Sequence, residues 1–159
     1  MTFGTTSMTS GTTKNLLSVD CVSPGLAYAC GQGGTVLKLT GTVWGALPTA
    51  FPNAAVDLVS CEVVGNVLWA AGDNAFYKID LGATSPAWQQ LPALAKLSKL
   101  NVISATDVYA ISAGARVVRF DGGAWNTLFT LSSGTLVGGG QVGGKVVYAG
   151  SLGVVVEGQ

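Results

Sequence analysis

One segment of the chain reads Val117-Val118-Arg119-Phe120-Asp121-Gly122-Gly123-Ala124-Trp125. Its β-branched and aromatic residues predict a β-strand. Asp-Gly-Gly predicts a tight turn, because glycine accepts backbone geometry that other residues resist. Trp125 then begins a second strand. Weaker copies of this pattern recur along the chain, so the sequence predicts a repeat protein.

The repeat is defined by an aromatic residue, small residues, a glycine-containing turn and a β-rich run with a charge inside it. The leading aromatics are Tyr28, Trp69, Tyr109 and Tyr148. Their spacings are 41, 40 and 39 residues, and counting from Tyr148 around the chain ends to Tyr28 gives 39 again. A regular period of this size indicates four units that close on themselves.

Four-stranded units of about 40 residues around a ring are the architecture of a β-propeller. We therefore expect one all-β domain with four blades. The blades are predicted at about residues 16–47, 56–91, 100–131 and 135–159 plus 2–7. The last unit reaches Gln159 before its fourth strand, so we expect the N-terminal strand to close the last blade, with Phe3 in the place of the tryptophan. Two alternatives stay open: half of an eight-bladed ring built by two chains, and exchange of the N-terminus with a neighbour.

The segments Asp107-Val108-Tyr109-Ala110 and Arg119-Phe120-Asp121-Gly122-Gly123-Ala124-Trp125 resemble a bacterial β-propeller repeat, and Ala27 to Trp44 is similar. That group includes sialidase-like (Asp-box) repeats and photosystem-II assembly-factor-like repeats. The chain departs from it in its small number of blades and in lacking the Ser and Thr that flank an Asp-box. The sialidase arginine set is also missing, since Arg116 and Arg119 are the only arginines. The resemblance implies a fold rather than an activity.

Composition limits the partners. Charged residues make up 10% of the chain, hydrophobic residues 48%, and the net charge is +0. A nucleic-acid binder would carry a basic patch, so we expect no nucleic-acid partner. No apolar run is long enough to span a bilayer, which predicts no membrane insertion. The N-terminus lacks the charged and apolar regions of a signal peptide, so we expect cytoplasmic synthesis.

The sequence contains no histidine, which excludes Ser–His and Cys–His nucleophile pairs. It also lacks a CxxC pair, so the common zinc-ligand sets are missing and we expect no cofactor or metal. Cys21 and Cys30 flank a predicted turn at Ser23-Pro24-Gly25, while Cys61 stands apart. A Cys21–Cys30 disulfide and buried free thiols are both open.

Three tryptophans, Trp44, Trp88 and Trp125, recur at one position of the repeat. They are candidates for sugar-stacking platforms, but we favour packing between blades because each buries a large apolar area. Trp69 belongs to the column of leading aromatics and is expected to lie in the interior. The third strands carry Lys38, Lys78, Arg119 and Glu157 at one position, which predicts a solvated strand face rather than a charged binding ring.

These features favour a non-enzymatic structural or protein-interaction propeller. Its partners are expected to be proteins of a larger assembly, copies of itself among them. The most concrete form is a phage virion component, such as a decoration, tail or baseplate-associated protein, located on a virion or extracellular particle surface. The alternative is a carbohydrate-binding, lectin-like propeller with glycan ligands. A sialidase-like glycoside hydrolase is the least favoured reading.

Overall fold

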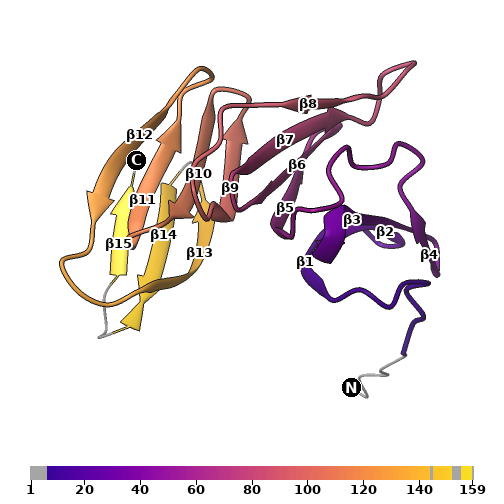
Figure 1. The fold of residues 1–159 in the computed structure, drawn as a ribbon, viewed down its shortest axis with the longest axis horizontal. Helices are drawn as coiled ribbons and strands as arrows, with labels where there is room; N and C mark the ends of the chain where they lie inside the picture. The colour runs from indigo at the N-terminus through magenta and orange to yellow at the C-terminus, as the bar shows by residue number, and fades with distance from the viewer. Residues whose placement is uncertain (1–6, 144, 152–154, 159) are drawn as a thin grey trace.

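The structure is a computed structural model that describes residues 7–143, 145–151 and 155–158. Those residues form four antiparallel sheets in chain order (Figure 1). The first contains β1 (Leu16–Ser23), β2 (Leu26–Gly31), β3 (Thr35–Thr40) and β4 (Val43–Ala46), with the 3-10 turn η1 (Gln32–Gly34) between β2 and β3. The second contains β5 (Leu58–Val64), β6 (Val67–Gly72), β7 (Ala75–Asp80) and β8 (Trp88–Gln90). The third contains β9 (Ser98–Ser104), β10 (Asp107–Ser112), β11 (Arg116–Phe120) and β12 (Trp125–Thr130). The fourth contains β13 (Leu136–Val142), β14 (Lys145–Gly150) and β15 (Val155–Gly158).

Each sheet is a meander in which consecutive strands pair. The turns between the first two strands of the first and second sheets contain Gly25 and Gly65, whose φ angles are 78° and 61°. Glycine is favoured there because a Cβ atom strains this left-handed conformation. The all-β fold of four successive propeller units predicted from the period is confirmed.

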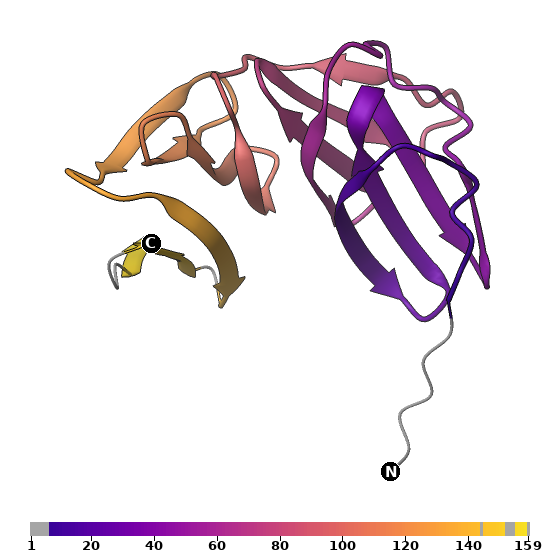
Figure 2. The same cartoon turned by 60° about the horizontal axis from the view of Figure 1, so that its bottom comes forward.

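The sheets lie side by side, with β1 against β5 and β5 against β9. Together they form an arc in which the fourth sheet does not lie beside the first (Figures 1 and 2). In the described part of the chain the fourth sheet has three strands. Phe3 and residues 2–6 of the predicted closing strand lie outside the described residues, so that closure stays a prediction. Ser7 is described and is not part of a strand.

The core lies between neighbouring sheets in three clusters. The first is between sheets one and two, around Tyr28, Leu58 and Leu68. The second is between sheets two and three, around Trp69 and Phe120, and the third joins sheets three and four. Each sheet therefore buries both faces only if it has a neighbour on each side.

In three of the four sheets the second strand ends at a glycine that contacts the segment entering the sheet, and we call this residue the anchor glycine. A Cβ on Gly31, Gly72 or Gly150 would lie 2.1 to 2.2 Å from the carbonyl oxygen of Asn15, Asp57 or Thr135, respectively. Such an approach is possible only without a side chain. The anchors therefore fix the register of the second strand against the segment that enters each sheet.

Tyr148 does not occupy the position in its strand that the spacing of the leading aromatics predicts. Tyr28 and Trp69 precede their anchor glycine by three residues, whereas Tyr148 precedes Gly150 by two. Because successive side chains of a strand point to opposite faces, this shortening places Tyr148 on the other face of its sheet. There it is 0% exposed and packs against Tyr109 of the third sheet. The structurally equivalent residue of the fourth sheet is Val147.

Candidate functional site

Trp88 and Trp125 hold the outer strands β8 and β12 against the connections between sheets. The Nε1–H of Trp88 donates to the carbonyl oxygen of Thr49 at 3.1 Å, and that of Trp125 donates to Pro92 at 2.8 Å. The rings also meet aromatic neighbours: the centroid of Trp88 is 5.2 Å from that of Phe51. Both N–H groups are therefore used within the protein.

Trp69 lies in the interior. It is 2% exposed and stacks on Phe76 with ring centroids 5.6 Å apart. The Nζ of Lys78 lies 5.2 Å from the Trp69 ring centroid. The same cation–aromatic pair recurs as Lys38 over Tyr28 and Arg119 over Tyr109, at 6.0 and 5.9 Å. The three basic residues of the third strands therefore lie over the leading aromatics of their sheets, whereas Glu157 pairs with Val147.

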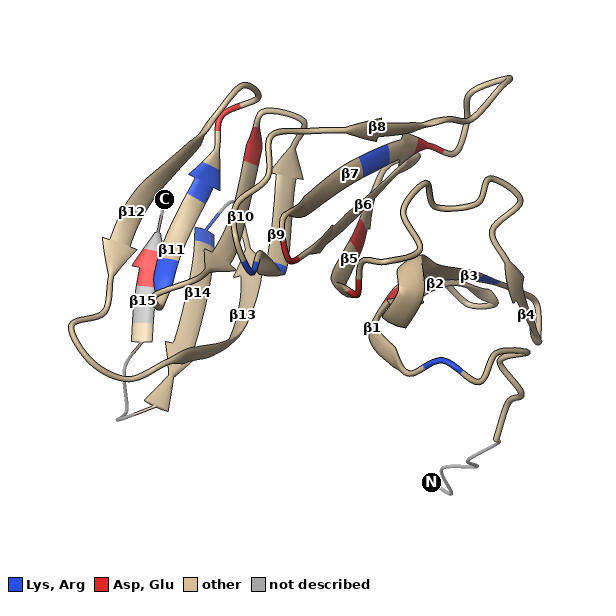
Figure 3. Ribbon diagram, viewed as in Figure 1, with Lys and Arg blue, Asp and Glu red and all other residues tan. Residues whose placement is uncertain are grey.

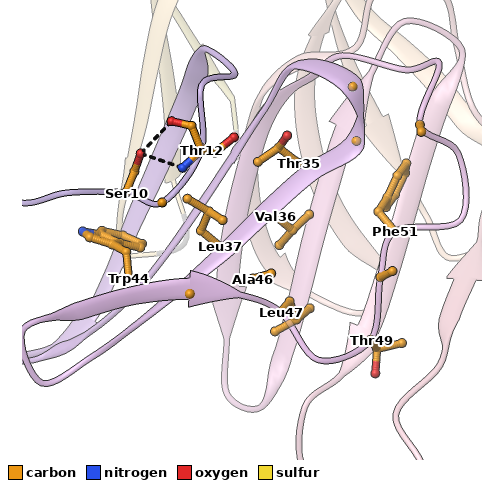
Figure 4. A pocket seen from close by; sticks show the side chains of 16 residues that line it. Ser10, Thr12, Thr35, Val36, Leu37, Trp44, Ala46, Leu47, Thr49 and Phe51 are labelled. Atoms are coloured by element: carbon orange, nitrogen blue, oxygen red, sulfur yellow. Dashed lines mark hydrogen bonds between the residues drawn. The ribbon is translucent and has the colours of Figure 1, made fainter.

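Trp44 differs from the other three tryptophans. It is half-buried on β4, and its indole N–H has no hydrogen-bond partner among the described residues. Its ring lines a pocket of about 460 Å³ in the first blade, which we call the first-blade pocket (Figure 4). Trp44 is thus the predicted tryptophan that a ligand can reach.

The first-blade pocket is built from five segments of the first blade and its flanks: Ser10–Thr12, Gly33–Leu37, Trp44–Leu47, Thr49–Phe51 and Ala54. Figure 4 shows Trp44 at one end and Phe51 at the other, with Leu37 and Val36 between them. None of the residues that line it is charged. Hydroxyl groups and glycine backbone supply its polarity, so the pocket suits a neutral ligand with apolar groups and a few hydrogen-bonding groups.

The N-terminal wall of this pocket was not predicted. Gly4 to Thr13 has the Ser/Thr/Gly composition of a flexible linker, and the structure describes it from Ser7. The structure instead folds this segment across the first sheet, where Ser10 Oγ donates to the carbonyl of Thr12 at 3.3 Å. Met8 and Ser10 also lie beside Val19 and Trp44. Small polar residues without hydrophobic periodicity give no sequence signal for such a contact.

Side chains from one inner strand clamp the backbone of the next. The N–H groups of Cys61 and Val63 donate to Ser18 Oγ at 3.2 Å and to Asp20 Oδ2 at 2.7 Å. One sheet later, Leu100 and Val102 donate to Ser60 Oγ at 3.0 Å and Glu62 Oε2 at 2.9 Å.

Burial raises the pKa of the Glu62 carboxyl to about 7, with a smaller contribution from the charge of Asp20. Its hydrogen-bond partners are the Val102 amide and the Gln141 side chain, so Glu62 has a clear structural role.

The aspartate of the turn described first is also structural. Asp121 Oδ1 accepts from the backbone N–H of Ala124 and Gly123 at 2.9 and 3.0 Å, and its Oδ2 accepts from Asn126. These bonds lower the pKa of Asp121. Asp121 therefore shapes the hairpin between β11 and β12.

The cysteines are free thiols. Cys21 and Cys30 lie on opposite faces of the first sheet, since Cys21 pairs with Ala27 and Cys30 with Ser18. The Cys21–Cys30 disulfide is therefore excluded by geometry. Cys30 lies instead beside Cys61 across the sheet contact, and the neighbouring thiol together with burial raises the pKa of Cys30. Within the described residues, no group of three or more His, Cys, Asp or Glu side chains could hold a metal ion.

No protein-family model and no curated protein matches the sequence. Solved structures do match. YCF48 bound to D1 peptide aligns with a TM-score of 0.66 and 17% identity over 88% of this chain and 49% of that chain. The computationally designed Ika4 protein aligns with a TM-score of 0.68 and 15% identity over 99% of this chain and 98% of that one. The designed Ika8 protein aligns with a TM-score of 0.67 and 13% identity over 89% of this chain and 45% of that one.

These likenesses support the propeller repeat fold and leave the repeat family open, because their identities are low. The chain spans about half the length of YCF48 and of Ika8. Among the described residues, no helix is long and apolar enough to cross a membrane.

Proposed function

We propose that this chain is a non-enzymatic protein-interaction propeller that binds an extended, uncharged peptide segment in the first-blade pocket. The observation that carries the proposal is the pocket itself, which is uncharged and has Trp44 and Phe51 at its two ends. Aromatic side chains supply large, rigid contact areas at low entropic cost. The hydroxyls and exposed backbone between them can pair with peptide groups.

Two further observations support a peptide ligand. The pocket is bordered by β4, the outermost strand of its sheet, so extended backbone can lie alongside it. YCF48, which has a similar fold, is described as bound to a D1 peptide. At 17% identity that likeness concerns the fold and motivates the choice of probe.

The test is selection from a displayed library of random peptides, followed by affinity measurements on synthetic copies of the enriched sequences. We expect enriched peptides to be poor in charge and to lose at least about tenfold in affinity on Trp44→Ala, as expected for loss of an aromatic anchor. Leu128→Ala is the matched control, because Leu128 is 48% exposed on β12, outside the pocket. Thermal melting should show both variants folded. No enrichment, or peptides that ignore Trp44→Ala, would contradict the proposal.

Carbohydrate binding is the second candidate, and the accessible ring of Trp44 is the observation that favours it. A sugar ring stacks on an indole while its hydroxyls bond to groups such as Ser10 and Thr12. A glycan array distinguishes the two candidates. Glycan binding that Trp44→Ala abolishes, with no peptide selected, would replace the peptide proposal.

The sharper form of the interaction proposal places the chain in a phage virion, as a decoration, tail or baseplate-associated protein at the particle surface. Its support is the low charge of the sequence and the lack of a catalytic constellation in it. Mass spectrometry of purified particles and of culture supernatant from the source tests this location. Finding the chain only in the soluble cell fraction would refute it.

A further inference from the structure

The two ends of the arc expose faces that are buried elsewhere in the same molecule. We call the free side of the first sheet the leading face and define it by the exposed residues Val19 and Cys21. Val19 is 59% exposed and Cys21 is exposed. The residue of the second sheet equivalent to Val19 is Cys61, which is 6% exposed. The residue of the third sheet equivalent to Cys21 is Val102, which is 1% exposed. Each of the two packs on the preceding sheet.

The trailing face is the free side of the fourth sheet and contains Val142, Val147, Ala149 and Val155 on a floor of Gly138 and Gly140, with the charged residues Lys145 and Glu157 beside them. Val142 is 75% exposed, Val147 37% and Val155 67%. Val147 stands three residues before its anchor glycine, as Tyr28 and Trp69 do. Those two residues are 4% and 2% exposed, because the next sheet covers them.

We propose that the leading face of one copy packs against the trailing face of a second copy, so that two chains complete one eight-bladed ring. The contact between them would repeat the contact already made between the first and second sheets. There the Cys61 thiol lies 3.9 Å from the carbonyl oxygen of Tyr28. Substituting the equivalent positions places Val19 of one copy beside Val147 of the other.

The shapes and charges of the two faces agree with this pairing. Gly138 and Gly140 stand where the inner contacts have the clamping side chains Ser18 and Asp20, and a Cβ on either glycine would meet nothing within 4 Å. Together with Val147 they line a shallow, open depression. Val19 is larger than the Cys61 of the inner contact, and the glycines of the trailing face leave room for it. Apolar packing thus replaces the polar clamp.

In Figure 3 the fourth sheet carries both colours, and the charged residues of its trailing face are Lys145 and Glu157. On the trailing side, Lys145 and Glu157 neutralise each other in an ion pair of 2.8 Å. Apolar sheet faces of this kind mark interaction surfaces.

The choice of a second copy follows from the geometry of the arc. The four sheets align with about half of YCF48 and of Ika8, so a second set of four is what a ring of that curvature lacks. Each copy has one leading and one trailing face, and two copies related by a two-fold axis bury both pairs. No free sheet face then remains. Trp44 is in register with Cys21 through the two strands between them, so it lies on the leading face and the second copy would cover part of the first-blade pocket. The dimer inference rests on the two faces rather than on a ligand in that pocket, and dimerisation and ligand binding at Trp44 would compete.

The first test is the mass of the 159-residue chain in solution, by light scattering and sedimentation. We expect a dimer at twice the 16.0 kDa of one chain. Cys21 should react with a bulky maleimide at least about tenfold more slowly in the dimer than in a monomeric variant, because the contact covers it. Cys30 and Cys61 are buried in both states. A chain that stays monomeric at high concentration, or that forms open-ended polymers, would overturn the proposal.

The second test uses charges at the proposed contact. Val19→Lys and Val147→Lys should each weaken the dimer at least about tenfold, because each buries an added charge in both contacts. Val43→Lys is the control: Val43 is 69% exposed on the opposite face of the first sheet. The double variant V19K/V147E should restore the dimer through two Lys–Glu pairs, which separates loss of contact from misfolding. Single variants that remain dimeric, or a double variant that stays monomeric while folded, would refute the pairing.

Discussion

Replacing Glu62 by Gln should stabilise the folded chain at pH 8 and remove a pH dependence between pH 5 and pH 8. Glu62 lies between the second and third sheets, where Oε2 accepts from the Val102 N–H at 2.9 Å and Oε1 from Gln141 Nε2 at 3.0 Å. Burial raises the pKa of this carboxyl from 4.5 to about 7, although the Val102 hydrogen bond opposes the rise. Glutamine retains the size of the side chain and an acceptor oxygen while removing the charge.

The sign follows from proton binding. The unfolded chain releases the Glu62 proton near pH 4.5, whereas the folded chain retains it up to about pH 7. The folded state therefore binds more protons in this window, and the stability that Glu62 contributes is lost as the pH rises through it. A rise in pKa from 4.5 to about 7 corresponds to about 3 kcal/mol. Because water partly reaches the carboxylate, we expect about half of that, about 1.5 kcal/mol.

The assay is urea unfolding at several pH values from 5 to 8. The wild-type free energy of unfolding should fall by about 1.5 kcal/mol across this range, and that of Glu62→Gln should stay nearly level. The lack of histidine helps, because no imidazole titrates in the same window. Asp20→Asn is the control at the equivalent clamp of the first sheet: it leaves Glu62 in place and should keep most of the pH dependence. A level wild-type curve, or an equally steep curve for Glu62→Gln, would refute the reasoning.

Three further outcomes are expected. Gly72→Ala should lower the free energy of unfolding by several kcal/mol or prevent folding, since its Cβ would lie 2.2 Å from a carbonyl oxygen. Gly45→Ala is the control: its Cβ would meet nothing within 4 Å, so the free energy of unfolding in urea should change little. Ser60→Ala should cost about 1–2 kcal/mol in the same assay, because it leaves the buried N–H of Leu100 without its acceptor. Deleting residues 1–8 should lower the melting temperature by several degrees if the N-terminus completes the last blade. An unchanged melting temperature would count against that closure.

The repeat could be predicted from the sequence because two physical requirements apply to every unit. Glycine is required at the tight turns, as at Gly25 and Gly65, and apolar side chains alternate along strands that are covered by neighbouring sheets. Tyr148 shows the limit of such reasoning. A shift of one residue in the spacing of the aromatics leaves the repeat recognisable in the sequence. In a strand, however, the same shift moves the side chain to the opposite face of the sheet. The distance to the anchor Gly150, rather than the distance to Tyr109, determines which face Tyr148 occupies.

The three tryptophans at one repeat position illustrate why a ligand site was harder to predict than the fold. Trp88 and Trp125 each donate to a carbonyl oxygen that belongs to the connection from the preceding sheet, at Thr49 and Pro92. Trp44 is on the first sheet, and in the described part of the chain no sheet precedes it. Its indole therefore lacks the partner that the repeat supplies elsewhere, and the N-terminal segment around Ser10 lies beside it instead. The first-blade pocket thus lies where that connection is absent among the described residues. Equivalent residues acquire different roles because their neighbours differ, and a single unit of the sequence does not contain that information.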